Sequence, residues 1–125
     1  MRVIVDGLNV IGSRPDGWWR DRPGAMRRLA GELSDHAGRT GDQVIVIFDG
    51  KPFELDGADP VEVRFATRRG PNAADDDIAA LVGADADPAS LTVVTSDSNL
   101  ADRVRASGGE VMGAGAFRRR LEGGS

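Results

Sequence analysis

The chain has 125 residues, 40% of them hydrophobic, a size and composition that suit one compact domain with a single core. It contains no cysteine, which excludes disulfides, thiolate catalysis and cysteine-ligated zinc. No apolar run approaches the roughly 20 residues needed to cross a membrane. Since the first apolar run already ends at Asp6, we also expect no signal peptide, and therefore a cytoplasmic protein without a membrane partner.

The formal net charge is −4 at pH 7, but the charges are unevenly spread along the chain. Residues 71–102 contain seven aspartates and no cation, whereas residues 13–30 contain five arginines against two aspartates. Residues 61–70 and 103–125 are also net basic. This distribution is compatible with a basic rim around an acidic centre, and equally with an ordinary solvated surface of mixed charge.

Short apolar segments predict strands at residues 2–5, 43–48, 61–65, 91–95 and 110–112. Helices are expected from Pro23 to Gly38, after a cap at Asn72, after a cap at Ser98, and from Gly115 to Leu121. This alternation predicts a three-layer α/β fold, with a central, mostly parallel sheet of about five strands covered by helices on both faces. We expect one domain over residues 1–121 and a disordered tail at 122–125.

Three of the predicted strands end on, or just before, an aspartate: Asp6, Asp49 and Asp97. In an open parallel sheet the carboxyl ends of the strands share one edge, and ligands bind beyond that edge. Each aspartate alone is explained equally well as a helix cap or a turn residue. Together they predict a group of carboxylates at one edge of the sheet.

Two of the expected helices add carboxylates to this edge. The first turn of one helix carries Asp75–Asp77, where acidic side chains also complement the helix dipole. Asp102 lies five residues after Asp97 in the next helix, where an ordinary solvated residue is the alternative. If these side chains meet Asp6, their mutual repulsion needs a cation, and all-oxygen ligands favour Mg²⁺ or Mn²⁺. The expected ligands are Asp6, Asp75, Asp97 and Asp102.

Other catalytic chemistry has few residues to use. His36 is the only histidine, and it falls in a predicted helix away from the strand ends, where we expect a surface or helix-end residue. Lys51 is the only lysine and lies outside any phosphate-binding G-x-x-x-x-G-K-[ST] loop. Metal-assisted hydrolysis is therefore the main option, in which one or two carboxylate-held ions lower the pKa of a water that attacks a phosphodiester.

Four segments carry a family resemblance, in the order "VDGLNVIG", "VIVIFDG", "NAADDDI" and "LTVVTSDSNLADRV". Together they resemble the NYN domains of the PIN-like ribonuclease superfamily, in its YacP-like branch, over almost the whole chain. The resemblance implies a PIN-like fold and a divalent-metal-dependent endoribonuclease that uses Mg²⁺ or Mn²⁺ and acts in RNA processing or decay.

The resemblance also implies roles for individual residues. Matched by position, the metal ligands are Asp6, Asp75, Asp97 and Asp102, and Asn9 is a polar companion counted with the catalytic residues. Asp49 and Ser96 match positions that support the ligands, and Asp76 is the alternative to its neighbour Asp75 as a ligand. Asp77 departs from the family pattern, where an aromatic residue is common, and we expect it to be solvated.

The segment 13–24 has no obvious family counterpart and is expected to overhang the site. Its two tryptophans and their basic neighbours suit stacking of single-stranded RNA; these residues are Trp18, Trp19, Arg20 and Arg22. The alternative is that one tryptophan packs on the core and anchors the loop. Arg68 and Arg69, and the later run Arg118–Arg120, are expected either to contact phosphates or to be solvated surface.

The sequence therefore favours a metal-dependent endoribonuclease whose partner is RNA, in single-stranded form. One alternative is a non-catalytic module that binds RNA or protein on the same fold, and another is a DNA-directed nuclease. Fold alone does not decide among them.

Overall fold

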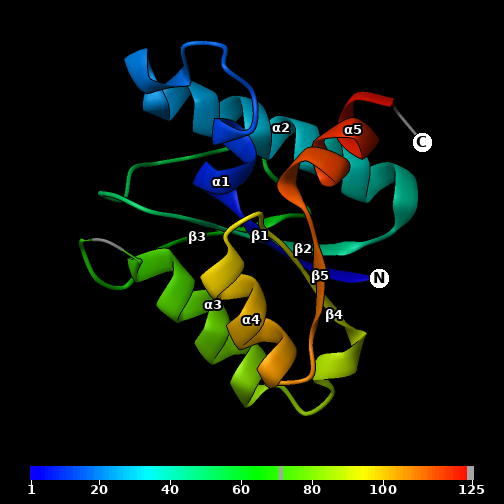
Figure 1. Cartoon of the computed structure of the whole chain (residues 1–125). Helices are drawn as coiled ribbons and strands as arrows, with labels where there is room; N and C mark the ends of the chain where they lie inside the picture. Colours follow the sequence, from blue (N-terminus) through cyan, green and yellow to red (C-terminus); the bar gives the residue numbers. More distant parts are fainter. Residues whose placement is uncertain (71, 124–125) are drawn as a thin grey trace.

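A computed structural model describes residues 1–70 and 72–123 of the chain. Its strands form one sheet in the order β3-β2-β1-β4-β5, and every neighbouring pair is parallel (Figure 1). The strands are β1 (Arg2–Asp6), β2 (Gln43–Phe48), β3 (Glu62–Phe65), β4 (Leu91–Val94) and β5 (Glu110–Met112). Every strand predicted from the sequence is present, and the sheet is wholly parallel.

Helices connect the strands and cover both faces of the sheet. They are α1 (Gly7–Gly12), α2 (Arg22–Thr40), α3 (Ala73–Ala84), α4 (Ser98–Ala106) and α5 (Ala114–Gly123), with short 3₁₀ turns η1 (Trp18–Arg20) and η2 (Pro88–Ser90). One layer holds α1, α2 and α5, and the opposite layer holds α3 and α4 (Figure 1). The predicted three-layer α/β fold is confirmed. Within the described residues, no helix is both long enough and apolar enough to span a membrane.

The central strand β1 is buried on both faces, which is why its sequence is continuously apolar rather than alternating. Val3 and Val5 belong to the core beneath α2, with Leu29 and Leu33. Ile4 points to the opposite face and belongs to the core beneath α3 and α4. Because successive side chains of a strand point to opposite faces, one five-residue segment supplies both cores.

Several boundaries differ from the sequence-based prediction. Helix α1 was not predicted, because it has six residues and no side-chain cap, and Gly7 lies against the Phe48 ring. Helix α4 is capped by Asp97 rather than Ser98: the backbone N–H of Leu100 donates to Asp97 Oδ1 at 3.0 Å. In the same way Asp21 caps α2.

Two further expectations need correction. His36 is buried, with 2% exposure, and its Nε2 lies 3.1 Å from Asp42 Oδ2, because α2 turns this position toward the core. Helix α5 continues to Gly123, so Glu122 and Gly123 are helical and not part of a disordered tail. The remainder of that predicted tail, residues 124–125, lies outside the described residues.

Candidate active site

The carboxyl edge of the sheet gathers aspartates from three strand ends. Asp6 is the last residue of β1, Asp49 follows β2 directly, and Asp97 stands between β4 and α4. Asp75 joins them from the first turn of α3. The charges of Asp75, Asp49 and Asp97 all act on Asp6, so the structure brings these four predicted residues into one electrostatic group.

Within this group the pKa shift is largest at Asp6, whose side chain is only 5% exposed. Burial, the largest cause, raises the pKa of its carboxyl from 3.8 to about 7. A hydrogen bond from Thr95 Oγ1, 3.0 Å from Asp6 Oδ2, acts in the opposite direction by stabilising the ionised form. Repulsion from the nearby carboxylates also raises the pKa, and its contribution is included in the value of about 7. The fold thus holds a carboxylate where its charge is costly.

Asp75 is shifted in the same direction. Burial raises the pKa of its carboxyl first, and repulsion from Asp97, Asp49 and the adjacent Asp76 adds to the shift. Arg103 of α4 opposes it, as a cation near this carboxylate. Sequence reasoning missed Arg103, because nothing in its spacing shows that α4 places it beside α3.

Backbone amides and hydroxyl groups hold the loops at this edge. The Ser96 N–H donates to Asn9 Oδ1 at 2.8 Å, and the Ala114 N–H donates to Ser96 Oγ at 2.9 Å. The Ala74 N–H donates to Asp49 Oδ1 at 3.0 Å, which ties the start of α3 to the end of β2. Asn9 and Ser96 therefore join α1, the loop before α4 and the start of α5 around the site.

The structure does not bring Asp102 into this group. Its side chain is 80% exposed, and its ion pair with Arg105 has an N–O distance of 4.0 Å. Five residues turn an α-helix by about 500°, so Asp102 projects about 140° away from the direction of Asp97. Asp102 is also absent from the charges that act on Asp6 and Asp75.

Two acidic neighbours of Asp75 have partners within the protein. Asp76 pairs with Arg68 and, at 2.9 Å, with Arg103. Asp77 accepts hydrogen bonds from the backbone N–H of Thr67 at 2.7 Å and from its hydroxyl at 2.8 Å. The expectation that Asp77 is simply solvated is therefore wrong, since it fastens the loop before α3.

The side chains as they stand do not form a finished metal cage. Across residues 1–70 and 72–123, no group of three or more histidine, aspartate or glutamate side chains is arranged to hold an ion. One oxygen each of Asp6, Asp49 and Asp97 accepts a hydrogen bond from the protein. These bonds leave each carboxylate with oxygen lone pairs for a ligand, but the side chains would have to move to surround an ion.

The loop after α1 presents one tryptophan and buries part of the other. Trp18 packs against the core beneath α2, which confirms that one tryptophan anchors the loop. Trp19 is 53% exposed, and the Arg20 guanidinium lies 6.0 Å from its ring centre. Arg22 lies 5.2 Å from the ring centre of Trp18.

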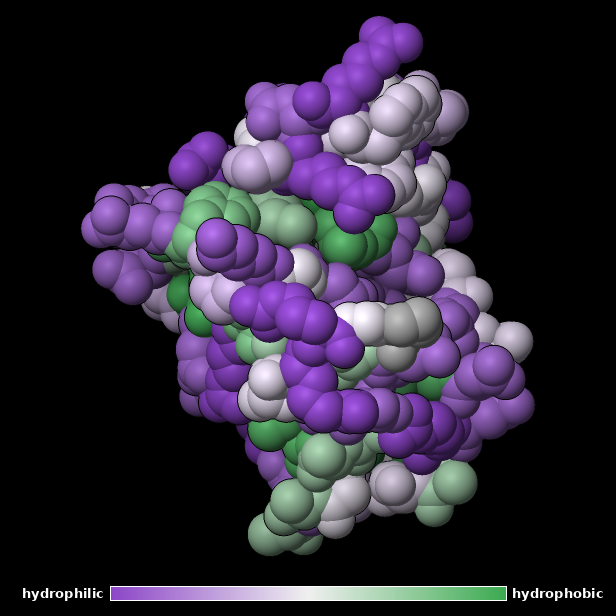
Figure 2. All heavy atoms as spheres, turned by 90° about the vertical axis from the view of Figure 1, so that its left-hand side faces the viewer, coloured by the Kyte–Doolittle hydropathy of each residue, from purple (hydrophilic) through white to green (hydrophobic). Residues whose placement is uncertain are grey.

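Figure 2 shows that the face carrying the start of α3 is mostly hydrophilic, with small separate hydrophobic areas.

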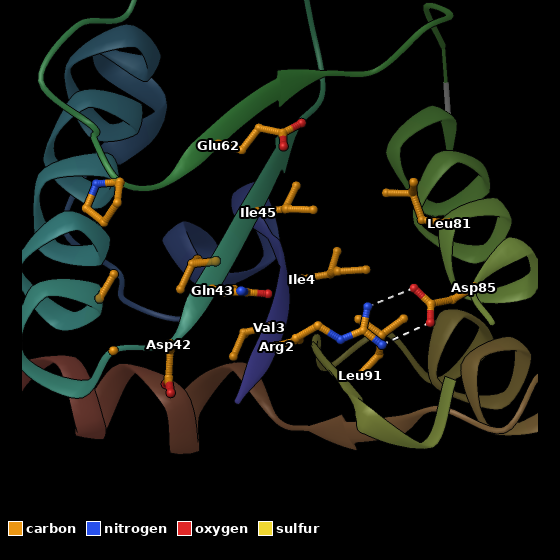
Figure 3. Close-up of a pocket in the computed structure, with 14 residues that line it drawn as sticks. Arg2, Val3, Ile4, Asp42, Gln43, Ile45, Glu62, Leu81, Asp85 and Leu91 are labelled. Carbon is orange, nitrogen blue, oxygen red and sulfur yellow. Dashed lines mark hydrogen bonds and ion pairs between the residues drawn. The ribbon is translucent and has the colours of Figure 1, made fainter. Parts of the chain in front are cut away.

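A different hollow lies at the opposite, amino end of the strands, with a volume of about 520 Å³ (Figure 3). Its floor includes Ile4, Ile45 and Leu91, and Arg2 makes two 2.9 Å hydrogen bonds to Asp85 at one side. The aspartates of the carboxyl edge do not line it. Because ligands of parallel sheets bind beyond the carboxyl ends of the strands, we place the candidate site at the aspartates and not in this hollow.

A wholly parallel five-stranded sheet with helices on both faces and an acidic carboxyl edge is consistent with a PIN-like α/β domain, a ribonuclease-type fold. The chain belongs to the YacP-like NYN domain family, whose model matches residues 3–124. This membership supports a nuclease or RNA-related function.

Two solved structures of Rae1 (YacP) from Bacillus subtilis are similar to this chain. The first has 26% identity and a TM-score of 0.83, and the alignment covers 99% of this chain and 75% of Rae1. The second, a tryptophan-to-leucine mutant, has 27% identity and a TM-score of 0.81, with 98% and 76% covered. A search of curated proteins found no match.

Proposed function

We propose that this protein is a divalent-metal-dependent endoribonuclease that hydrolyses RNA phosphodiester bonds at the carboxyl edge of its sheet. The observation that carries the proposal is Asp6, a buried carboxyl whose pKa is raised to about 7 by burial and by three neighbouring carboxylates. Concentrated carboxylates that repel one another are costly unless a cation joins them. Membership of the YacP-like NYN family supports the interpretation of this carboxylate group as a nuclease site.

The donor set suits Mg²⁺ or Mn²⁺, since every candidate ligand is a carboxylate oxygen. Asp6, Asp75 and Asp97 would hold the ion, and Asp49 would support them while keeping the start of α3 in place. When bound, such an ion lowers the pKa of a water and offsets charge on the phosphodiester.

The other residues of the site would position RNA. Asn9 and Ser96 fix the loop that carries Asp97, and thereby the orientation of its carboxylate. Trp19 offers an exposed ring for stacking of an unpaired base, and Arg20 beside it offers a cation for the backbone. Arg68 is already paired with Asp76, so its contact with phosphate would compete with that ion pair.

The first experiment combines Mn²⁺ titration by calorimetry with cleavage of a labelled single-stranded RNA. Asp97→Asn is the test variant, because asparagine still caps α4 while losing the carboxylate charge. Asp35→Asn, an exposed position on α2, is the matched control. We expect metal binding and cleavage to be lost in the first variant and kept in the second. Equal Mn²⁺ affinity and cleavage in Asp97→Asn and wild type would refute the proposed site.

Asp102→Asn tests whether Asp102 is a metal ligand, as the family resemblance implies, or lies outside the ligand set of Asp6, Asp75 and Asp97. The exposed position of Asp102 predicts that this variant keeps the metal affinity and cleavage rate of wild type. A loss comparable to that of Asp97→Asn would restore Asp102 to the ligand set.

The RNA-binding surface is tested by Trp19→Ala, with the affinity for single-stranded RNA measured in EDTA. Loss of one stacked base lowers affinity by roughly 5- to 150-fold. Trp19→Phe, which keeps a stacking ring, serves as the control. An affinity unchanged in Trp19→Ala would remove Trp19 from the proposed surface.

A non-catalytic RNA-binding module is the second candidate, favoured by the lack of a ready metal cage among the described side chains. It predicts RNA binding that is equally strong with and without Mn²⁺, and no cleavage of any nucleic acid. Preferential cleavage of DNA in the same assay would instead indicate a DNA-directed nuclease.

A further inference from the structure

Arg118 of α5 is a buried cation with unused hydrogen-bonding capacity. The residue is 7% exposed, and its Nε and Nη1 atoms have no hydrogen-bond partner among the described residues. Its ion-pair contact is with Glu32 of α2, whose Oε1 lies 3.6 Å from Nη1, beyond hydrogen-bonding distance. Buried guanidinium donors are normally satisfied, so this arrangement needs an acceptor that residues 1–70 and 72–123 do not supply.

Arg118 lines a hollow of about 280 Å³ between α1, α2 and α5. Two further arginines line the same hollow: Arg28, and Arg14, which is paired with Glu122 of α5, so that a phosphate at Arg14 would compete with that ion pair. Asp16 and Glu32 also face it, so the lining has a net charge of +1 when its three arginines and two acids are counted. Glu32 is about one-third exposed, and an anion bound at Arg118 would compete with this ion pair.

This hollow follows the candidate active site along the contact between α1 and α5. Asn9, at the site, lines a second hollow together with Ser13 and Ala114. Arg118 lies one helical turn beyond Ala114 on α5, and Arg14 follows Ser13 directly, so the two hollows follow one another where α1 and α5 lie side by side (Figure 1). A phosphodiester chain that runs from the aspartates along the contact between α1 and α5 would reach the arginines.

We propose that Arg118, with Arg14 and Arg28, binds a phosphate group of the RNA backbone outside the bond that is cleaved. A guanidinium binds phosphate oxygens strongly, and the Nε and Nη1 atoms of Arg118 together carry three N–H donors that have no partner among the described residues. The assignment of the phosphate to RNA rests on the proposed function, whereas the phosphate site itself does not.

Inorganic phosphate is the probe for the site, titrated into the full chain in chloride buffer while the Arg118 Nε–H resonance is followed by NMR. The test variant is Arg118→Met, which keeps an unbranched side chain in the buried position. Arg119→Met is the control, since Arg119 is the next residue of α5 and is exposed. We expect phosphate to shift the Arg118 resonance, and Arg118→Met to weaken binding at least about tenfold while Arg119→Met does not. No shift in wild type, or equal weakening in both variants, would overturn the site.

A second arm identifies the source of the phosphate. Affinity for a short single-stranded RNA is measured in EDTA, where the proposed metal site and cleavage play no part. A loss in Arg118→Met that exceeds the loss in Arg119→Met supports an RNA backbone phosphate. Normal RNA affinity in a variant that has lost inorganic phosphate would overturn the RNA assignment. Absence of cleavage in wild type, with both phosphate and RNA binding intact, would refute the nuclease proposal and leave this site standing.

Discussion

Replacing Asp6 by asparagine should make the protein more stable, by an amount that grows as the pH rises from 3.8 to about 7 and stays constant above that. Asparagine keeps the size of the side chain and can still accept the hydrogen bond from Thr95 Oγ1. It removes the charge that burial and the neighbouring carboxylates oppose. The variant thus isolates the free-energy cost of holding an ionised carboxylate at this edge of the sheet.

The magnitude follows from proton linkage. Since the pKa of Asp6 is 3.8 in its ordinary state and about 7 in the fold, the folded protein keeps a proton that the unfolded chain releases between these values. Stability contributed by Asp6 therefore falls as pH rises from 3.8 to about 7, by up to about 1.4 kcal/mol per pH unit, and levels off above that. The total is ~4 kcal/mol.

Urea denaturation of wild type and Asp6→Asn at pH 4 and pH 8 in EDTA measures this directly. The two proteins should have nearly equal free energies of unfolding at pH 4, and the variant should exceed wild type by about 2–4 kcal/mol at pH 8. Adding Mn²⁺ at pH 8 should stabilise wild type and leave the variant unchanged. A difference between the proteins that is the same at both pH values would refute the electrostatic reasoning.

Three further variants test the surroundings of the site. Thr95→Val removes the hydrogen bond to Asp6, so it should raise the pKa of Asp6 further and cost about 1–3 kcal/mol at pH 8; an unchanged carboxyl titration by NMR would contradict this. Arg103→Gln removes the cation that opposes the shift of Asp75, and the pKa of Asp75 should rise; a fall would show that Arg103 acts differently. Gly7→Ala places a methyl group against the Phe48 ring and should destabilise the fold by about 1–3 kcal/mol in urea, whereas Gly31→Ala, in open space on α2, should not.

The sequence determined the layers and the edge at which the carboxylates meet. Continuous apolar runs identify buried parallel strands, because both faces of such strands are covered. Strand ends then place Asp6, Asp49 and Asp97 at one edge, since parallel strands point the same way. These inferences need only local patterns and the geometry of a parallel sheet, and so they were confirmed.

Only the tertiary structure decided which side chains share that edge and in what state. Rotation along α4 turns Asp102 to solvent, and packing of α4 beside α3 brings Arg103 near Asp75. The pKa of Asp6 depends on burial beneath elements that are distant in sequence, among them Thr95 after β4. Arg118 is indistinguishable in sequence from its two exposed neighbours, and only the packing of α5 on α2 buries it. Burial and charge proximity are sums over the whole fold, which is why no local pattern reveals them.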